Sequence, residues 1–232
     1  NNIQIACIPN PNTVFTLLDD GKGMSNGELI EAMRLAANDP DSPREGADLG
    51  KFGLGLKTAS FSQCTDLTVL SKKKGEVSLK QWDLHYISKK NEWLLITPDI
   101  SEYENIPLFE EFMKQESGTL VVWRGIDSFP ESDIPDKLEI LRSHLSLVFH
   151  CFLEGAVPGK KALTIHVNGQ KLEPFNPFNP RHIATQQMLA EKIKYLNSEI
   201  IVQPYILPHH SKLSQEEFDK YATKDGYTKS QG

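Results

Sequence analysis

The stretch DLGKFGLGLKTASF, residues 48–61, sets three glycines and two lysines between an acidic segment and an apolar run. Glycine-rich turns that lead into a helix are typical phosphate-binding segments, because backbone N–H groups and the helix dipole attract anions. The stretch is not a P-loop, since Leu56 intrudes between Gly55 and Lys57. It also lacks the third glycine that a dinucleotide-binding turn needs after Gly53 and Gly55. It therefore predicts an anion site of another kind, with a flexible connector as the alternative.

A second glycine motif, Asp19-x-Gly21-x-Gly23, follows the apolar run 13–18, which reads as a strand. A carboxylate at the end of a buried strand is costly unless it accepts hydrogen bonds. The exocyclic amine of adenine is a suitable donor, and glycines allow the backbone to approach a flat base. A plain Asp-Gly turn is the alternative interpretation of this motif when it is taken alone.

The third motif is Ser117-Gly118-Thr119, at the start of a predicted strand over 118–125. It has little weight alone, because Ser-Gly-Thr is common where strands begin. Its place in the chain, after the other two motifs, makes the set of three more specific than any one of them.

The remaining patterns predict a mixture of strands and helices. Ser25 and Glu28 have the spacing of a capping box, which predicts a helix over 26–36, and a helix is also expected over 137–153. Lys74-Gly75 predicts a hairpin turn, as does Asn168-Gly169. Further expected elements are a strand over 3–8, a helix after Gly55, a strand over 92–97 and a helical stretch near 184–196.

Composition narrows the class of protein. A formal charge of −6 over 232 residues argues against non-specific nucleic-acid binding by the whole chain. Cys7, Cys64 and Cys151 are far apart and form no zinc or disulfide pattern, so a reducing cytoplasm is expected. No signal peptide and no membrane-spanning run is expected either.

Prolines and asparagines gather around residue 175, which we interpret as a boundary between a first domain, 1–175, and the start of a second, 176–232.

Taken in order, the three motifs resemble the GHKL ATPases, the superfamily of gyrase, MutL, heat-shock chaperone, histidine kinase and MORC ATP-binding domains. DDGKGM is similar to the adenine-side box, GKFGLGLKTAS to the phosphate-side box, and Gly118-Thr119 to the head of the third box. The segments FGLGLK and NGQKLEP resemble those of MORC-like members most. The resemblance covers about residues 1–175 and implies a Bergerat-type α/β two-layer sandwich, with a mixed, largely antiparallel sheet backed by helices.

The resemblance also implies ligands and roles. ATP and Mg²⁺ are the expected cofactors, Asp19 is expected to contact adenine N6, Gly23 to lie near the base, and Thr119 to support the adenine end through water. The loop 38–50 is expected to be a lid, and the amides of residues 53–57 with Lys57 to hold the phosphates. The full set of implied binding residues is Asp19, Gly21, Gly23, Gly50, Phe52, Gly53, Leu54, Gly55, Leu56, Lys57 and Thr119.

Three functions are compatible with this resemblance. The first is ATP hydrolysis that drives conformational change or homodimerisation in the intact protein. The second is a nucleotide-sensing interaction module that does not hydrolyse ATP, and the third, which the sequence favours least, is a histidine kinase. The helix with a catalytic Glu and a Mg²⁺-holding Asn that precedes the first strand in the family matches nothing in this sequence. We therefore expect weak binding and no turnover from these 232 residues alone, and no catalytic residue is assigned.

Overall fold

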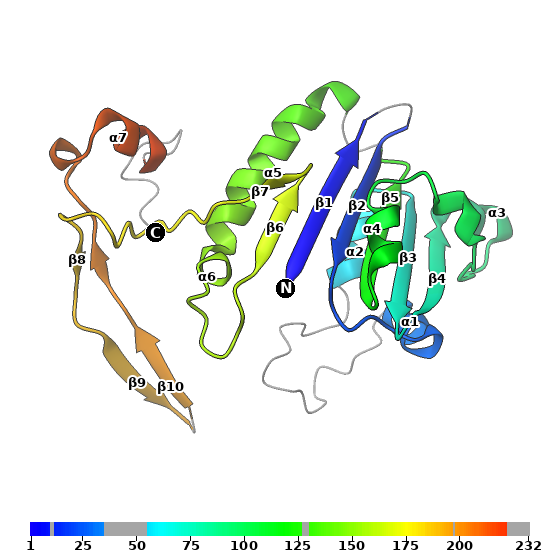
Figure 1. The fold of residues 1–232 in the computed structure, drawn as a ribbon, viewed down its shortest axis with the longest axis horizontal. Helices are drawn as coiled ribbons and strands as arrows, with labels where there is room; N and C mark the ends of the chain where they lie inside the picture. The colour runs from blue at the N-terminus through cyan, green and yellow to red at the C-terminus, as the bar shows by residue number, and fades with distance from the viewer. Residues whose placement is uncertain (10–11, 35–54, 127–129, 197, 222–232) are drawn as a thin grey trace. The chain divides into compact units, whose positions relative to one another are not determined.

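The computed structural model describes residues 1–9, 12–34, 55–126, 130–196 and 198–221 (Figure 1). The chain divides into two compact units, Asn1–Glu173 and Pro174–Gly232. This division falls beside the proline- and asparagine-rich segment around residue 175.

The first unit is built on a seven-stranded sheet in the order β4-β3-β5-β2-β1-β6-β7. Neighbouring strands are antiparallel except for β1 and β6, which are parallel. This confirms the expected mixed, largely antiparallel sheet. The strands are β1 (Asn2–Ile8), β2 (Val14–Asp19), β3 (Asp66–Lys73), β4 (Glu76–Asp83), β5 (Gly118–Arg124), β6 (Thr164–Val167) and β7 (Gln170–Lys171).

Helices cover both faces of this sheet. Their bounds are α1 (Asn26–Met33), α2 (Gly55–Phe61), α3 (Leu84–Lys90), α4 (Phe109–Lys114), α5 (Ile134–Val148) and α6 (His150–Leu153), with 3-10 turns η1 (Ile100–Tyr103) and η2 (Glu131–Asp133). Side chains alternate between the two faces of a strand, so Val69 and Leu70 of β3 enter different parts of the core. Val69 packs with α1 and α2, whereas Leu70 packs with η1 and α4. The third part of the core lies between α5 and the strands β1 and β6, which run side by side in Figure 1.

Two turns have the backbone that their sequences predict. Lys74 and Gly75 both have positive φ (53° and 85°), as a two-residue hairpin turn between β3 and β4 requires. Asn168 and Gly169 do the same (48° and 77°) between β6 and β7. Both predicted hairpins are therefore confirmed.

Several predicted elements differ from the structure. The helix expected over 26–36 ends at Met33, because Arg34 has an extended backbone (ψ 139°). The helix expected over 137–153 starts earlier, at Ile134, where a proline in the first turn is compatible with a helix start, and it breaks at Phe149 between α5 and α6. The strand expected over 92–97 is reduced to a single bridge between Gln81 and Ile96.

The second unit contains short elements. They are β8 (Gln186–Gln187), β9 (Glu191–Tyr195), β10 (Ser198–Val202), β11 (Tyr205–Ile206), η3 (His210–Lys212) and α7 (Gln215–Tyr221). β9 pairs with β10 and β8 pairs with β11, both antiparallel. The helical stretch expected near 184–196 is therefore wrong, because Glu191–Tyr195 pairs as a strand with Ser198–Val202.

Candidate functional site

The motif Asp19-x-Gly21-x-Gly23 forms a closed turn at the end of β2. Asp19 is the last residue of β2, and its carboxylate oxygen Oδ1 accepts a hydrogen bond from the backbone N–H of Gly21 (2.7 Å). Burial raises the pKa of Asp19, and the hydrogen bond from Gly21 partly opposes this effect. The carboxylate is thus a partly desolvated acceptor held by its own turn.

Gly23 occupies a position that excludes any other side chain. Its φ is +64°, and a Cβ atom built there would lie 1.8 Å from the carbonyl oxygen of Lys72 on β3. The sequence predicts that this glycine allows close approach to a base. The structure shows an additional reason for it, since the turn itself packs directly against β3.

The motif Asp19-x-Gly21-x-Gly23 and the motif Ser117-Gly118-Thr119 meet across the sheet. Thr119 lies directly opposite Asp19 in the antiparallel register of β2 and β5. The Ser117 hydroxyl donates to the carbonyl oxygen of Gly21 (2.8 Å), and a Cβ on Gly118 would lie 2.4 Å from the carbonyl oxygen of Asp19. Residues nearly a hundred positions apart in the sequence therefore meet at one end of two central strands, where β2 ends and β5 begins (Figure 1). We call this end of the sheet the Asp19 edge.

Ser71 of β3 lies at the same edge, opposite Thr119. None of the three sequence motifs includes this serine. Its side chain is completely buried, and its hydroxyl oxygen accepts from the backbone N–H of Met24 (2.8 Å). The same oxygen lies 3.2 Å from Thr119 Oγ1 and 3.3 Å from the carbonyl oxygen of Gly118. A lone serine within a strand gives no sequence signal, and only the register of β3 with β5 brings Ser71 to Thr119.

The phosphate-side motif is described only in part. Gly50, Phe52, Gly53 and Leu54 lie outside the described residues, as does the expected lid over 38–50. Gly55 is exposed at the start of α2, and Leu56 packs against the core cluster beneath α1 and α2.

Lys57 has a different environment from the one that the sequence predicts. Its side chain is 2% exposed, and its ammonium donates to the carbonyl oxygens of Ala32 and Arg34, each at 2.8 Å. Burial lowers the pKa of Lys57. A buried ammonium needs acceptors, and the carbonyl groups at the end of α1 supply them. The structure therefore gives the Lys57 ammonium two main-chain partners, and contact of Lys57 with phosphate stays a prediction.

The helix α1 is anchored at both ends beside this site. Ser25 and Glu28 form the predicted capping box, and Lys73 of β3 adds an ion pair to Glu28 (2.6 Å). At the other end, the indole N–H of Trp82 donates to the carbonyl oxygen of Met33 (3.0 Å). Side chains from β3, β4 and α2 thus hold the helix that follows the Asp19 turn.

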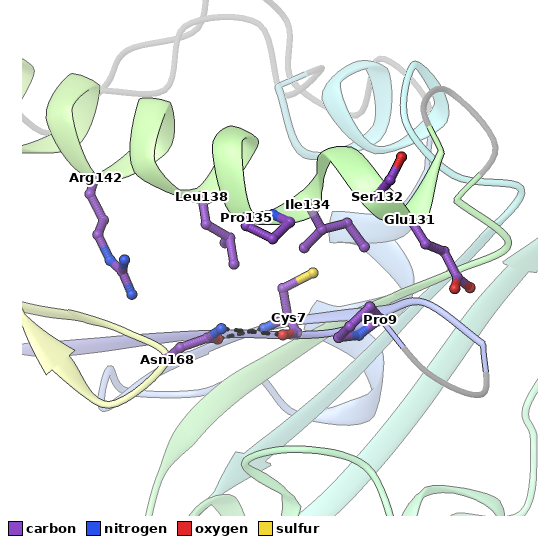
Figure 2. Close-up of a pocket in the computed structure, with 9 residues that line it drawn as sticks. All are labelled: Cys7, Pro9, Glu131, Ser132, Ile134, Pro135, Leu138, Arg142 and Asn168. Atoms are coloured by element: carbon purple, nitrogen blue, oxygen red, sulfur yellow. Dashed lines mark hydrogen bonds between the residues drawn. The ribbon is translucent and has the colours of Figure 1, made fainter.

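A separate pocket lies at the opposite end of β1 from the Asp19 edge. It has a volume of about 600 Å³ and lies between the start of α5 and the turn after β6 (Figure 2). The Asn168 side chain accepts from the backbone N–H of Cys7 (2.8 Å) and donates to its carbonyl oxygen (3.3 Å), as the dashed lines show. Among the described residues of the three motifs, none lines this pocket.

The described part of the chain contains no group of three or more His, Cys, Asp or Glu residues that could hold a metal ion. Among the same residues, no helix is both long and apolar enough to cross a membrane.

Comparison with known proteins identifies the family of the chain. The sequence model of the family described as Histidine kinase-, DNA gyrase B-, and HSP90-like ATPase matches residues 1–119, just over half of the 232 residues. The chain belongs to this family of ATPases. The match begins at the first strand and ends at Thr119, so it includes all three motifs.

Solved structures with a similar fold come from type II topoisomerases. The ATPase and transducer domains of DNA topoisomerase II from Balamuthia mandrillaris are 14% identical with a TM-score of 0.46, over 81% of this chain and 47% of that chain. The ATPase region of Saccharomyces cerevisiae topoisomerase II is also 14% identical with a TM-score of 0.46, over 82% and 49%. The chain thus spans about half the length of these structures. No curated protein sequence matches it.

Proposed function

We propose that the chain binds ATP with the adenine base at the edge formed by Asp19 and Thr119. The observation that carries the proposal is that these two residues lie directly opposite each other, with the carboxylate partly desolvated. A partly buried carboxylate gains most from a donor such as an exocyclic amine. The family to which the chain belongs is a family of ATPases, which supports ATP as the ligand.

The phosphates belong, in this proposal, to the glycine-rich segment that ends at α2. Backbone N–H groups of residues 53–57 are the proposed donors. The hydrogen bonds from Lys57 to the carbonyl groups at the end of α1 position the start of α2. Mg²⁺ would be held chiefly by the phosphates themselves, as is usual for nucleotide complexes. In this proposal none of the described residues holds the metal ion.

For the intact protein we propose that ATP hydrolysis drives a conformational change or homodimerisation. The segment FGLGLK supports a relationship to MORC-like members of the family. Residues 176–232 are proposed to begin a transducer-like domain. No disulfide involves Cys7, Cys64 or Cys151, which supports a reducing cytoplasm. A module that senses ATP without hydrolysing it is distinguished from this proposal by steady phosphate release from the full-length protein.

Calorimetry with ADP on the full-length protein tests the site. Asp19→Asn replaces the acceptor carboxylate by an amide, so a charge-assisted hydrogen bond of about 1.5–3 kcal/mol is lost and affinity falls about tenfold to a hundredfold. Asp20→Asn is the matched control, because it removes the same charge from an exposed neighbour. Equal ADP affinity in the wild type and in Asp19→Asn would contradict the assignment.

A further inference from the structure

The buried hydroxyl of Ser71 connects the three segments that form the proposed adenine site. It contacts the backbone N–H of Met24 in the turn after β2, and both Gly118 and Thr119 at the start of β5. Its side chain is fully buried, so bulk water does not compete for these contacts. The directions of the hydrogen bonds can therefore be worked out from the protons available.

A serine hydroxyl has one proton to donate and two lone pairs that accept. The Met24 N–H can only donate, so it uses one lone pair of Ser71 Oγ. The Gly118 carbonyl oxygen can only accept, so it receives the Ser71 proton. The remaining contact, with Thr119 Oγ1 at 3.2 Å, then requires Thr119 to donate to the second lone pair of Ser71.

This arrangement fixes the chemical character of Thr119. Its one proton points to Ser71, so only lone pairs of its oxygen remain for the site. Asp19, its cross-strand partner, presents a carboxylate, which is also an acceptor. Directly opposed residues in antiparallel strands have Cβ atoms about 4.5–5.5 Å apart and side chains on one face. The edge therefore presents two neighbouring acceptors.

We propose that Ser71 is a specificity-determining positioning residue, which holds Thr119 as an acceptor so that the site favours 6-amino purines over 6-keto purines. This inference rests on the proposed function, since it concerns the base that occupies the Asp19 edge. An amino group donates to both acceptors, whereas a keto oxygen at the same position meets two acceptors and no donor. Unpaired polar groups of this kind discriminate strongly between bases.

The test measures the affinities of ADP and inosine diphosphate for the full-length protein. In the wild type, ADP binds at least tenfold more tightly. Ser71→Ala releases the Thr119 hydroxyl, which can then turn and donate to a keto oxygen, so the ratio of the two affinities falls about threefold to tenfold. Ser71→Thr keeps the hydroxyl and restores the ratio. Ser78→Ala removes the same atom from the residue opposite Ser71 on β4 and leaves the ratio unchanged.

An unchanged ratio in Ser71→Ala, with both affinities lowered equally, would overturn the proposal. If Ser71→Ala does not fold, Thr119→Val supplies the answer, because loss of the acceptor lowers the ratio, and an unaltered ratio in that variant overturns the proposal as well. Failure of the proposed function has a different signature. In that case the wild type binds neither nucleotide, or Asp19→Asn binds ADP as tightly as the wild type does.

Discussion

The ammonium nitrogen of Lys57 lies 2.8 Å from the carbonyl oxygen of Arg34, so the second residue after the start of α2 is bound to the chain just beyond α1. A second bond of the same length joins Lys57 to Ala32. These contacts hold the first turn of α2 against the C-terminal end of α1. Lys57 thereby links the helix after the adenine-side motif to the helix after the phosphate-side motif.

Replacing Lys57 with Met should therefore lower stability without nucleotide. The substitution keeps much of the side-chain volume but leaves two carbonyl groups without their donor, which costs about 1–3 kcal/mol. Urea unfolding checks this, with Lys89→Met as the control, because Lys89 is exposed on α3. Unchanged stability together with a large loss of ADP affinity would show that Lys57 acts on phosphate instead.

Two glycines near the site should respond in opposite ways to alanine. Gly23→Ala combines a φ of +64° with a Cβ 1.8 Å from the Lys72 carbonyl oxygen, so the turn must move. We expect a loss of several kcal/mol in the free energy of unfolding, and loss of ADP binding. In Gly27→Ala, the added Cβ meets nothing within 4 Å, and the residue lies in α1. Stability there should be unchanged or should rise by up to about 1 kcal/mol.

The ion pair between Glu28 and Lys73 should make stability depend on acid pH. The hydrogen bond from Lys73, followed by the backbone N–H of Ser25, lowers the pKa of Glu28 from 4.5 to about 2. A carboxyl whose pKa falls on folding stabilises the fold above its unfolded-state pKa. This contribution is complete above pH 4.5 and is lost as the pH falls toward 2.

Melting temperatures of the wild type and Lys73→Met between pH 6 and pH 3 check this dependence. The difference between the two proteins should narrow as the pH falls, and also in high salt, because the pair is partly exposed. Lys114→Met removes a lysine from a longer, more exposed pair with Glu110 and serves as the control. A difference that stays constant down to pH 3 would mean that the pair does not stabilise the fold.

At the far end of the sheet, Asn168 should matter for stability and not for nucleotide binding. Its side chain bonds both backbone polar groups of Cys7, and its φ of 48° is unfavourable for most residues. Asn168→Ala should cost about 1–3 kcal/mol. ADP affinity should be unchanged, since Asn168 contacts Cys7 near the end of β1, whereas Asp19 lies opposite Ile3 near its start. The exposed neighbour Gln170, replaced by Ala, is the control.

The sequence predicts the parts of this molecule that depend on local chemistry. The turn at Asn168-Gly169 and the capping box of Ser25 follow from short patterns, and both are confirmed. The largely antiparallel sheet follows from the family resemblance, and it is confirmed as well. The helix predicted near 184–196 is wrong because a short apolar pattern does not separate a helix from a strand unless the pairing partner is known. Here residues 191–195 form the strand β9 because they pair with β10.

The site shows the same division. Asp19 and Thr119 are identified by their motifs, whereas Ser71 enters the site only through strand register. Lys57 follows a glycine-rich turn in the sequence, which points to phosphate, but the carbonyl groups at the end of α1 are its partners in space. Contacts between segments that are distant in the sequence depend on tertiary packing, and no local pattern encodes them.

The most direct test of the central claim is a crystal structure of the full-length protein with ADP. The distance from the exocyclic amine of adenine to the Asp19 carboxylate should be about 2.7–3.2 Å, the range of a hydrogen bond. Thr119 should lie within reach of the same amine, directly or through one water. A nucleotide bound elsewhere, with both Asp19 and Thr119 out of contact with the base, would contradict the account.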